Sequence, residues 1–210
     1  MANINRWTEA SHATDYLAMT IPHRSEGEAV LLECLPNGAS RILDVGCGDG
    51  RLLALVLEHC PQATGIAIDF SPTMLERVRQ RFAGDKRVEV REHNLDHRLP
   101  ELGKFDAVVS SFAIHHVTDE RKRELYAEVF HLLAPAGVFC NLEHVSSPTP
   151  RLHSQFLTAL GKSLETEDPS NKLLDVETQH GWLRSIGFED VDCYWKWREL
   201  ALLSGLKPAS

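Results

Sequence analysis

The chain carries a glycine-rich turn, Leu43-Asp-Val-Gly-Cys-Gly-Asp-Gly-Arg-Leu52, between two segments of opposite character. The apolar run 41–45 predicts a buried strand, and the segment 51–60, rich in leucine and valine, predicts a helix that Pro61 ends. A loop between a strand and a helix presents backbone N–H groups and the positive end of the helix to a ligand. Because glycine also permits tight turning and close approach, this stretch predicts an α/β fold that binds an anionic or polar ligand.

Outward from this turn, short apolar runs keep alternating with helical segments. Strands are expected at 64–68, 88–90, 105–110 and 138–142, with helices at 71–82 and 119–134. Strands separated by helices pair in parallel and carry helices on both faces of the sheet. Two more strands, at 188–194 and 199–203, lie close enough along the chain to form an antiparallel hairpin. We therefore predict a Rossmann-like, doubly wound α/β fold with a seven-stranded, mostly parallel sheet and an N-terminal helical cap.

The length of 210 residues suits a single domain, which we divide into four parts. Its first part mixes bulky and polar side chains, and its third is polar, rich in proline and long enough for one helix. The four parts are a helical cap at 1–40, a cofactor-binding core at 41–145, a substrate-side insertion at 146–175, and a helix and hairpin at 176–210.

Composition narrows the class of protein and its partners. The chain has 22 basic and 30 acidic residues, and a net charge of −8 argues against a nucleic-acid partner. We find no signal peptide and no apolar run as long as a membrane span, so no membrane partner and a cytoplasmic location are expected. Five scattered cysteines without a C-x-x-C pair indicate reduced thiols and no metal site. A monomer and a homodimer both remain open.

The glycine spacing separates two classes of nucleotide ligand. The nicotinamide and flavin fingerprint G-x-G-x-x-G requires glycine at position 51, where this chain has Arg51. Asp44 places a carboxylate beside the loop, as the amino group of a methionine moiety requires. Asp69 follows the next predicted strand, where a carboxylate accepts hydrogen bonds from a ribose diol. Each aspartate has a second interpretation as a helix cap, and a lone glycine-rich turn is often only a connection.

Four motifs in order resemble those of class I S-adenosylmethionine-dependent methyltransferases, over about residues 40–143. The glycine-rich turn is similar to the first signature motif of that family. The other three are Gly65-Ile-Ala-Ile-Asp-Phe-Ser71, Phe105-Asp-Ala-Val-Val-Ser-Ser111 and Leu132-Leu-Ala-Pro-Ala-Gly-Val138. The resemblance implies S-adenosyl-L-methionine as the cofactor and transfer of its methyl group to a small-molecule acceptor by in-line displacement.

The resemblance also implies a set of cofactor contacts. Asp44 would face the methionine amino group, Asp69 would bind the ribose hydroxyls, and Ser111 would lie near the sulfonium. Phe70 or Met74 would pack on the adenine. At Asn94 and Leu95 the chain departs from the acidic residue that the family usually places on the adenine amine. The expected cofactor-binding residues are Asp44, Gly46, Cys47, Gly48, Asp69, Phe70, Met74, Asn94, Leu95 and Ser111.

Candidates for the acceptor side follow the fourth and fifth predicted strands, where open sheets bind ligands. The candidate catalytic residues are His115, His116, Glu143 and His144. His115-His116 also resembles a pair common in small-molecule members of the family, where it often orders the loop. In the cap, Tyr16, His23 and Arg24 are candidate substrate-binding residues, because adjacent arginine and histidine side chains suit a carboxylate or phosphate.

Two other functions stay open at this point. The segment 175–188 resembles the C-terminal region of carboxy-S-adenosylmethionine synthases, which modify the cofactor, and Arg151 or Arg184 would then reach the donor methyl group. A non-catalytic protein that binds S-adenosylmethionine is the other alternative, favoured by a closed or apolar pocket above the sulfonium. A nucleic-acid methyltransferase is disfavoured, since Ser110-Ser-Phe-Ala113 stands where a motif of the Asn/Asp-Pro-Pro-Tyr/Phe type would be.

Overall fold

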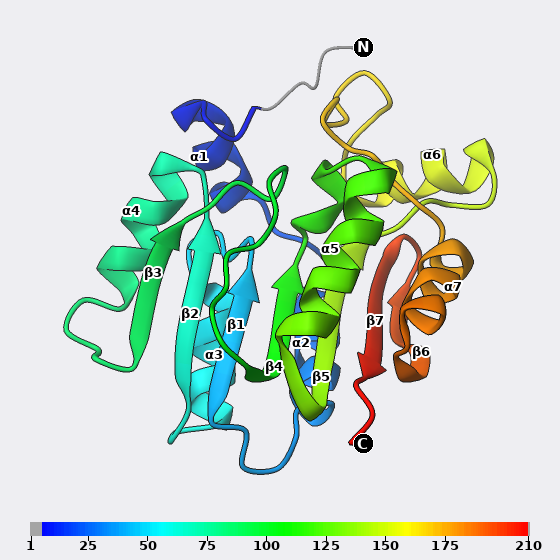
Figure 1. The fold of residues 1–210 in the computed structure, drawn as a ribbon. Coiled ribbons are helices and arrows are strands. Elements are labelled where there is room, and N and C mark those ends of the chain that lie inside the picture. The colour runs from blue at the N-terminus through cyan, green and yellow to red at the C-terminus, as the bar shows by residue number, and fades with distance from the viewer. Residues whose placement is uncertain (1–5, 210) are drawn as a thin grey trace.

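The computed structural model describes residues 6–209, and within them seven strands form one sheet (Figure 1). The strand order is β3-β2-β1-β4-β5-β7-β6, with β1 to β5 parallel and β7 antiparallel to both β5 and β6. The strands are β1 (Arg41–Val45), β2 (Thr64–Asp69), β3 (Val88–Glu92), β4 (Phe105–Ser111), β5 (Leu133–His144), β6 (Glu189–Trp197) and β7 (Leu200–Leu206). This confirms the predicted fold class; residues 1–5 of the predicted cap and Ser210 lie outside the described residues.

Helices cover both faces of the sheet. The helical elements are α1 (Ala10–Ala18), α2 (Arg24–Glu33), α3 (Arg51–His59), α4 (Pro72–Arg81), the short 3-10 helix η1 (Ile114–His116), α5 (Asp119–Leu132), α6 (Pro150–Ala159) and α7 (Val176–Ile186). α2 and α3 pack behind the sheet in the view of Figure 1, whereas α5 and α7 pack in front of it. Successive side chains of a strand point to opposite faces, so Ile42 packs with the first layer and Leu43 with the second.

The topology locates a crevice at one edge of the sheet. β1 pairs with β2 on one side and with β4 on the other, so the order of the strands reverses next to β1. In open α/β sheets, ligands bind outside the carboxyl ends of the strands at such a reversal. α1 and the segment between α6 and α7 lie over this edge (Figure 1). The cap and the insertion thus border the place where the glycine-rich turn emerges.

β5 begins earlier than the sequence predicts. We expected the helix to run to Ala134 and the strand to begin at Val138, but α5 ends at Leu132 and β5 starts at Leu133. Leu133 pairs with Phe105, and the register then shifts before Val138 pairs with Ala107. The predicted turn residues are therefore absorbed as an irregularity within the strand rather than standing before it.

Ser71-Pro72 predicts a helix start with serine as the cap and proline in the first turn. Pro72 does occupy the first turn of α4, but the Ser71 hydroxyl has no hydrogen-bond partner among the described residues. Instead, the backbone N–H of Ser71 donates to Oδ1 of Asp69 at 2.8 Å. The Asp69 carboxylate thus satisfies a backbone N–H at the start of the helix, which is the capping role that its second interpretation predicted.

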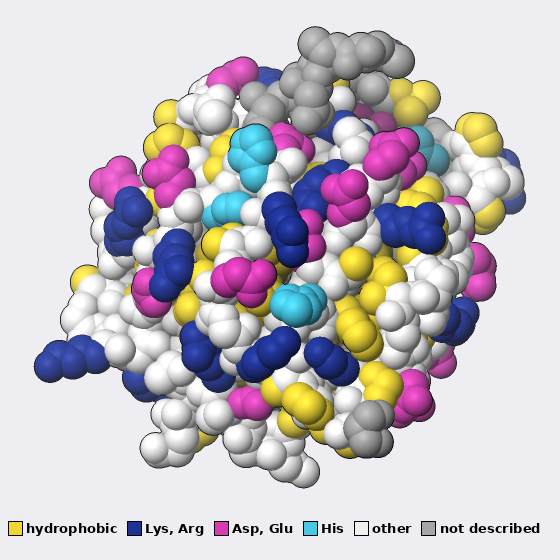
Figure 2. Space-filling model, viewed as in Figure 1, with side chains coloured by type: hydrophobic (Ala, Val, Ile, Leu, Met, Phe, Trp, Pro, Cys, Tyr) yellow, Lys and Arg dark blue, Asp and Glu magenta, His cyan; other side chains and the backbone are white. Residues whose placement is uncertain are grey.

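Charged side chains of both signs cover the α5 face of the molecule. Figure 2 shows Lys and Arg interspersed with Asp and Glu across this view. Two charged side chains of α5, Arg121 and Lys122, are buried beneath this surface and pair with Glu128 and Asp119. Among residues 6–209, no helix has the length and the apolar character that crossing a bilayer requires.

Candidate functional site

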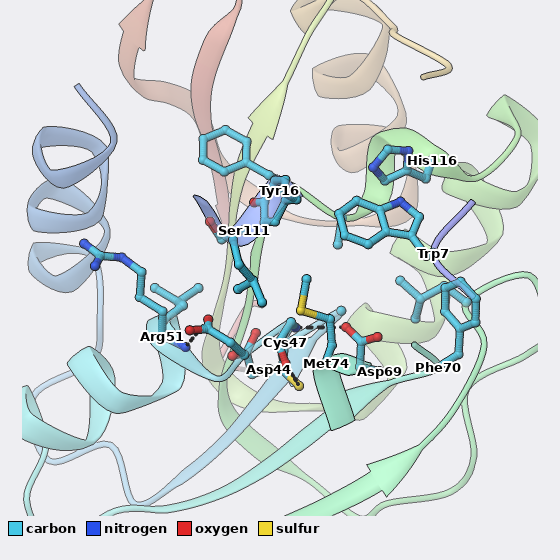
Figure 3. A pocket seen from close by; sticks show the side chains of 18 of the residues that line it. Trp7, Tyr16, Asp44, Cys47, Arg51, Asp69, Phe70, Met74, Ser111 and His116 are labelled. Carbon is cyan, nitrogen blue, oxygen red and sulfur yellow. Dashed lines mark hydrogen bonds between the residues drawn. The ribbon is translucent and has the colours of Figure 1, made fainter. Parts of the chain in front are cut away.

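A cavity of about 440 Å³ opens at the carboxyl ends of β1, β2 and β4, beneath α1 (Figure 3). Its floor comes from the glycine-rich turn and its far wall from the ends of β2 and β4. Of the residues expected at the site, the cavity is lined by Tyr16, Arg24, Asp44, Gly46, Cys47, Gly48, Asp69, Phe70, Met74, Asn94, Leu95, Ser111 and His116. Residues more than a hundred positions apart in the sequence thus meet around one space.

Two glycines of the turn adopt backbone conformations that other residues rarely accept. Gly46 has φ +68° and Gly48 has φ +54°, both in the left-handed region. A Cβ on Gly46 would also lie 2.3 Å from Cβ of Ala113 in the loop after β4. The turn therefore packs so closely against the loop after β4 that no side chain fits at position 46.

Asp44 is a buried acid without a partner. The residue is 1% exposed, and neither carboxylate oxygen has a hydrogen-bond partner among the described residues. Burial first, and the charge of Asp69 second, raise the pKa of Asp44 to about 8. Such an acid at a cavity wall fits a ligand that brings a positive charge, since an ammonium group restores the ionised carboxylate. The amino group of a methionine moiety meets that requirement.

Asp69 is oriented by the backbone around it. Its Oδ2 accepts the Gly48 N–H at 2.8 Å, and its Oδ1 accepts the Ser71 N–H at the same distance. Burial raises the pKa of Asp69, although these hydrogen bonds oppose the shift. A carboxylate has about four acceptor positions, so two remain for a pair of hydroxyl groups. Asp44 and Asp69 thus fit the amino group and the ribose of one nucleoside that bears an amino acid.

Another part of the cavity is lined by large apolar side chains. Phe70 and Met74, which the resemblance places on the adenine, line the cavity (Figure 3), and so does Leu95. Asn94 also lines it, but its side-chain oxygen already accepts the Asp96 N–H at 2.9 Å. Asp96, to which no motif pointed, borders the same cavity. It places an acidic group one position beyond the pair of residues that we expected there.

One buried acid of the cap, Glu28, holds an arginine of the cap and an arginine at the start of α3. Glu28, 2% exposed, accepts from Nε of Arg24 at 2.8 Å and from Nε and Nη2 of Arg51 at 2.9 and 2.7 Å. Arg24 also donates to Ser111 Oγ at 3.3 Å and lies over the ring of Phe112, 5.4 Å from its centre. We call these three residues, Arg24, Glu28 and Arg51, the arginine clamp; both of its arginines line the cavity.

The structure separates His23 from Arg24, although the two are adjacent in the sequence. His23 precedes α2 in the left-handed region with φ 60°, and its Nδ1 lies 2.8 Å from Glu26. Its ring lies 4.5 Å from that of Trp197, outside the cavity lining. Tyr16 stays beside Arg24, and burial raises its pKa while Arg24 opposes the rise. The structure therefore brings Tyr16 and Arg24 together and turns His23 away.

The predicted catalytic residues divide into three positions. His116 lines the cavity beside Trp7 (Figure 3). His115 lies behind it, with Nδ1 2.5 Å from Oε1 of the buried Glu143, whose pKa burial raises to about 7. His144 faces elsewhere, since its Nε2 lies 3.0 Å from Glu199. Of these four residues, His116 alone is among those that line the cavity within residues 6–209.

Sequence reasoning missed residues that reach the cavity from distant segments. Trp7 from the N-terminal segment, Phe112 after β4 and Ser170 from the insertion all line it. Phe112 has φ 53°, a strained conformation for a bulky residue and a feature common at binding sites. No sequence motif includes Trp7, Phe112 or Ser170 as a binding residue. The only hint in the sequence was that Trp7 is an aromatic residue within the predicted cap.

The chain is similar to proteins of known family. A demethylmenaquinone methyltransferase of Clavibacter sepedonicus is 32% identical over 194 residues, which cover 83% of this chain and 76% of that protein. The chain belongs to the class I S-adenosylmethionine-dependent methyltransferase family. The family model described as a methyltransferase domain matches residues 42–137 of this chain, and S-adenosyl-L-methionine is the cofactor.

The chain spans less than two thirds of the length of several other relatives. An uncharacterized methyltransferase of Mycobacterium tuberculosis is 35% identical over 127 residues, and the match covers 60% of each protein. Among solved structures, an O-methyltransferase family protein from Burkholderia thailandensis superposes with a TM-score of 0.75 at 23% identity. That comparison covers 98% of this chain and 62% of the other, and it shows the shared fold.

Proposed function

We propose that this methyltransferase transfers the methyl group of S-adenosylmethionine to a small aromatic acceptor that carries a ring hydroxyl, such as a quinol. One observation carries the proposal: a single cavity joins the unpartnered Asp44 to an aromatic section formed by Trp7, Tyr16 and Phe112. Figure 3 shows Tyr16 and Trp7 across the cavity from Asp44 and Asp69. The name of the Clavibacter relative, a demethylmenaquinone methyltransferase, supports an acceptor of this kind.

The residues of the chain supply position and proton transfer. When bound, S-adenosylmethionine supplies an electrophilic methyl group on a sulfonium. Aromatic walls align a ring acceptor and exclude water, and alignment of this kind contributes about 7–11 kcal/mol in favourable cases. His116 takes the hydroxyl proton of the acceptor and thereby activates the ring oxygen or the neighbouring ring carbon for attack on the methyl group. Arg24 and Tyr16 hold the developing negative charge of the ring oxygen.

The alternative functions receive less support. A cofactor-modifying activity would need Arg151 or Arg184 near the methyl group, but neither is among the residues that line the cavity. Arg151 is exposed on α6, and Arg184 donates to the Val191 carbonyl at 2.9 Å. A purely binding role is disfavoured by the polar groups of the aromatic section, among them Arg24, Ser111 and His116.

Calorimetric titration and a transfer assay test the proposal. We expect S-adenosylmethionine and S-adenosylhomocysteine to bind at micromolar concentration, and Asp69→Ala to weaken both by ~10-fold or more, about 1.4 kcal/mol. The assay uses S-adenosylmethionine labelled in its methyl group, with 1,4-dihydroxynaphthalene as the acceptor under reducing conditions. Label should move to the naphthalene ring or its oxygen with the native chain and with the control Asp85→Ala, which alters an exposed ion pair far from the cavity.

Two results would contradict the proposal at different levels. If neither cofactor form binds, the assignment of the cavity to S-adenosylmethionine is wrong. If both bind but no label moves to this or to related phenols and quinols, the hydroxylated aromatic acceptor is wrong, while the cofactor site stands.

A further inference from the structure

Two residues of the insertion, Asp168 and Ser170, form a series of hydrogen bonds that reaches the ring of His116. Ser170 Oγ lies 2.9 Å from Nδ1 of His116 and donates to Oδ1 of Asp168 at 2.8 Å. The backbone N–H of Ser170 donates to the same Oδ1 at 2.9 Å. Asp168 Oδ2, in turn, lies 3.1 Å from Nε2 of His12 in α1. Three segments far apart in the sequence therefore meet at one side of this ring.

The hydrogen bonds that link His116, Ser170 and Asp168 can be donated in only one direction. Although burial opposes it, the two hydrogen bonds from Ser170 lower the pKa of Asp168, so its carboxylate is ionised at neutral pH and only accepts. The Ser170 hydroxyl spends its single hydrogen on Asp168. Its oxygen must then accept from Nδ1 of His116, which places the ring proton on that nitrogen.

The state of the ring follows from its surroundings. Burial first, and the neighbouring His115 second, lower the pKa of His116 well below its usual range, so the ring is neutral at neutral pH. A neutral imidazole carries one proton, and with that proton on Nδ1 the other nitrogen has a free lone pair. Among residues 6–209, the side-chain hydrogen bond found for this ring uses Nδ1, and none is found for Nε2.

We infer that Asp168 and Ser170 are positioning residues that hold His116 in its Nδ1–H form and leave Nε2 as the proton acceptor in the cavity. The inference rests on the proposed function, in which an acceptor hydroxyl loses a proton. It adds to that function a role for the insertion at 146–175: residues of this segment orient the base, His116. The insertion contains none of the cofactor motifs. Nε2 takes the hydroxyl proton, and the electron pair of that O–H bond stays with the acceptor, which attacks the methyl carbon. As the new bond to the methyl carbon forms, the C–S bond of the sulfonium would break, its electron pair would stay on sulfur, and S-adenosylhomocysteine would be the leaving group.

The segment around Ser170 is docked closely enough to set this geometry. The Lys172 N–H donates to the His115 carbonyl at 2.8 Å, and its Nζ donates to the His116 carbonyl at 2.6 Å. Lys172 thus binds the backbone of η1, while Ser170 binds the ring. The other charged or titratable groups that act on the His116 ring are His115 on η1, Asp168 in the insertion and Glu143 on β5. Both Ser170 and His116 line the cavity, so the bonded pair lies where an acceptor would enter.

Nitrogen-15 NMR of the histidine rings reads the tautomer directly, in the full chain with S-adenosylhomocysteine and without any acceptor. We expect the native His116 to show a protonated Nδ1 and a bare Nε2, and Ser170→Ala to give a mixture of tautomers or the Nε2–H form. Asp168→Ala should act like Ser170→Ala. Asp168→Asn should keep the native tautomer, because the Ser170 N–H and hydroxyl both require an oxygen at the Oδ1 position. Ser163→Ala, at an exposed serine of the same insertion, is the matched control.

Kinetics with 1,4-dihydroxynaphthalene give the second readout. Ser170→Ala and Asp168→Ala should lower kcat at least ~10-fold, within the ~10²–10⁴-fold that a general base contributes, while the Kd for S-adenosylhomocysteine stays unchanged. Asp168→Asn should retain activity near that of the native chain. A native His116 protonated on Nε2, or a tautomer and a kcat untouched by Ser170→Ala, would overturn the inference. If the native chain binds no cofactor or transfers no methyl group, the proposed function fails instead, and the NMR result still reports on the tautomer.

Discussion

Gly46 shows how far a single residue controls the cofactor site. Its φ of +68° costs a residue with a side chain ~1–2 kcal/mol, and a Cβ there would meet the Ala113 side chain at 2.3 Å. We expect Gly46→Ala to lower the free energy of unfolding by ~3 kcal/mol or more and to weaken S-adenosylhomocysteine binding beyond ~100-fold. Urea unfolding and calorimetry measure the two effects.

Gly38 provides a control that separates backbone strain from the clash. It has a similar φ of +76°, but a Cβ on Gly38 would meet no atom within 4 Å. Gly38→Ala should therefore cost only the ~1–2 kcal/mol of strain and leave binding unchanged. Equal losses of stability and binding in the two variants would show that the contact with Ala113 does not matter.

At the scale of elements, the arginine clamp joins α2 to the start of α3. Removing the Glu28 carboxylate leaves Arg24 and Arg51 beside each other without their shared partner. Breaking a fully buried pair costs ~3–5 kcal/mol, and we expect less here because Arg51 is about half exposed. Glu28→Gln should lower the free energy of unfolding by ~1–3 kcal/mol, measured by urea denaturation.

Glu26 is the matched control for the clamp, because it is an exposed glutamate in the first turn of the same helix. Glu26→Gln should change stability by no more than ~0.5 kcal/mol. Since α3 follows directly on the glycine-rich turn, Glu28→Gln should also weaken cofactor binding, whereas Glu26→Gln should not. Equal stability losses in the two variants would contradict a structural role for the clamp.

At the scale of the whole molecule, the buried Asp44 makes stability depend on pH. Its pKa is about 8 in the folded chain and near 3.8 in an unfolded one. The folded state therefore binds the proton more tightly, and stability is greatest below pH 4 for this group and falls as pH rises toward 8. We expect Asp44→Asn to remove part of this fall, ~2–5 kcal/mol, when thermal unfolding is followed from pH 5 to pH 9 without cofactor.

Cofactor binding should reverse the protonation of Asp44. A bound ammonium group favours the ionised carboxylate, so binding of S-adenosylhomocysteine at pH 7 should release a proton. The measured binding enthalpy should then differ between buffers of different ionisation enthalpy, and this difference should vanish in Asp44→Asn if that variant still binds. A native binding enthalpy that is the same in every buffer would contradict this account.

Local features of the sequence determined the fold and the residues that we assign to the cofactor. The run Arg41–Val45 carries Ile42, Leu43 and Val45 because β1 is buried on both faces, and Gly46 is glycine because its backbone is left-handed. Asp44 and Asp69 lie at the carboxyl ends of β1 and β2, and the spacing of residues along the sequence is enough to predict those positions. Regularities of this kind reside in a few neighbouring residues, so they were visible before any contact was known.

The acceptor side was decided by the tertiary structure. His115 and His116 are neighbours in the chain, yet one pairs with Glu143 and the other with Ser170. His23 and Arg24 diverge because the backbone of His23 turns left-handed at the start of α2. Adjacent residues point in different directions at such places, and their partners lie many positions away along the chain. Sequence spacing carries no record of those long-range contacts, which form only when the cap and the insertion pack over the carboxyl ends of the strands.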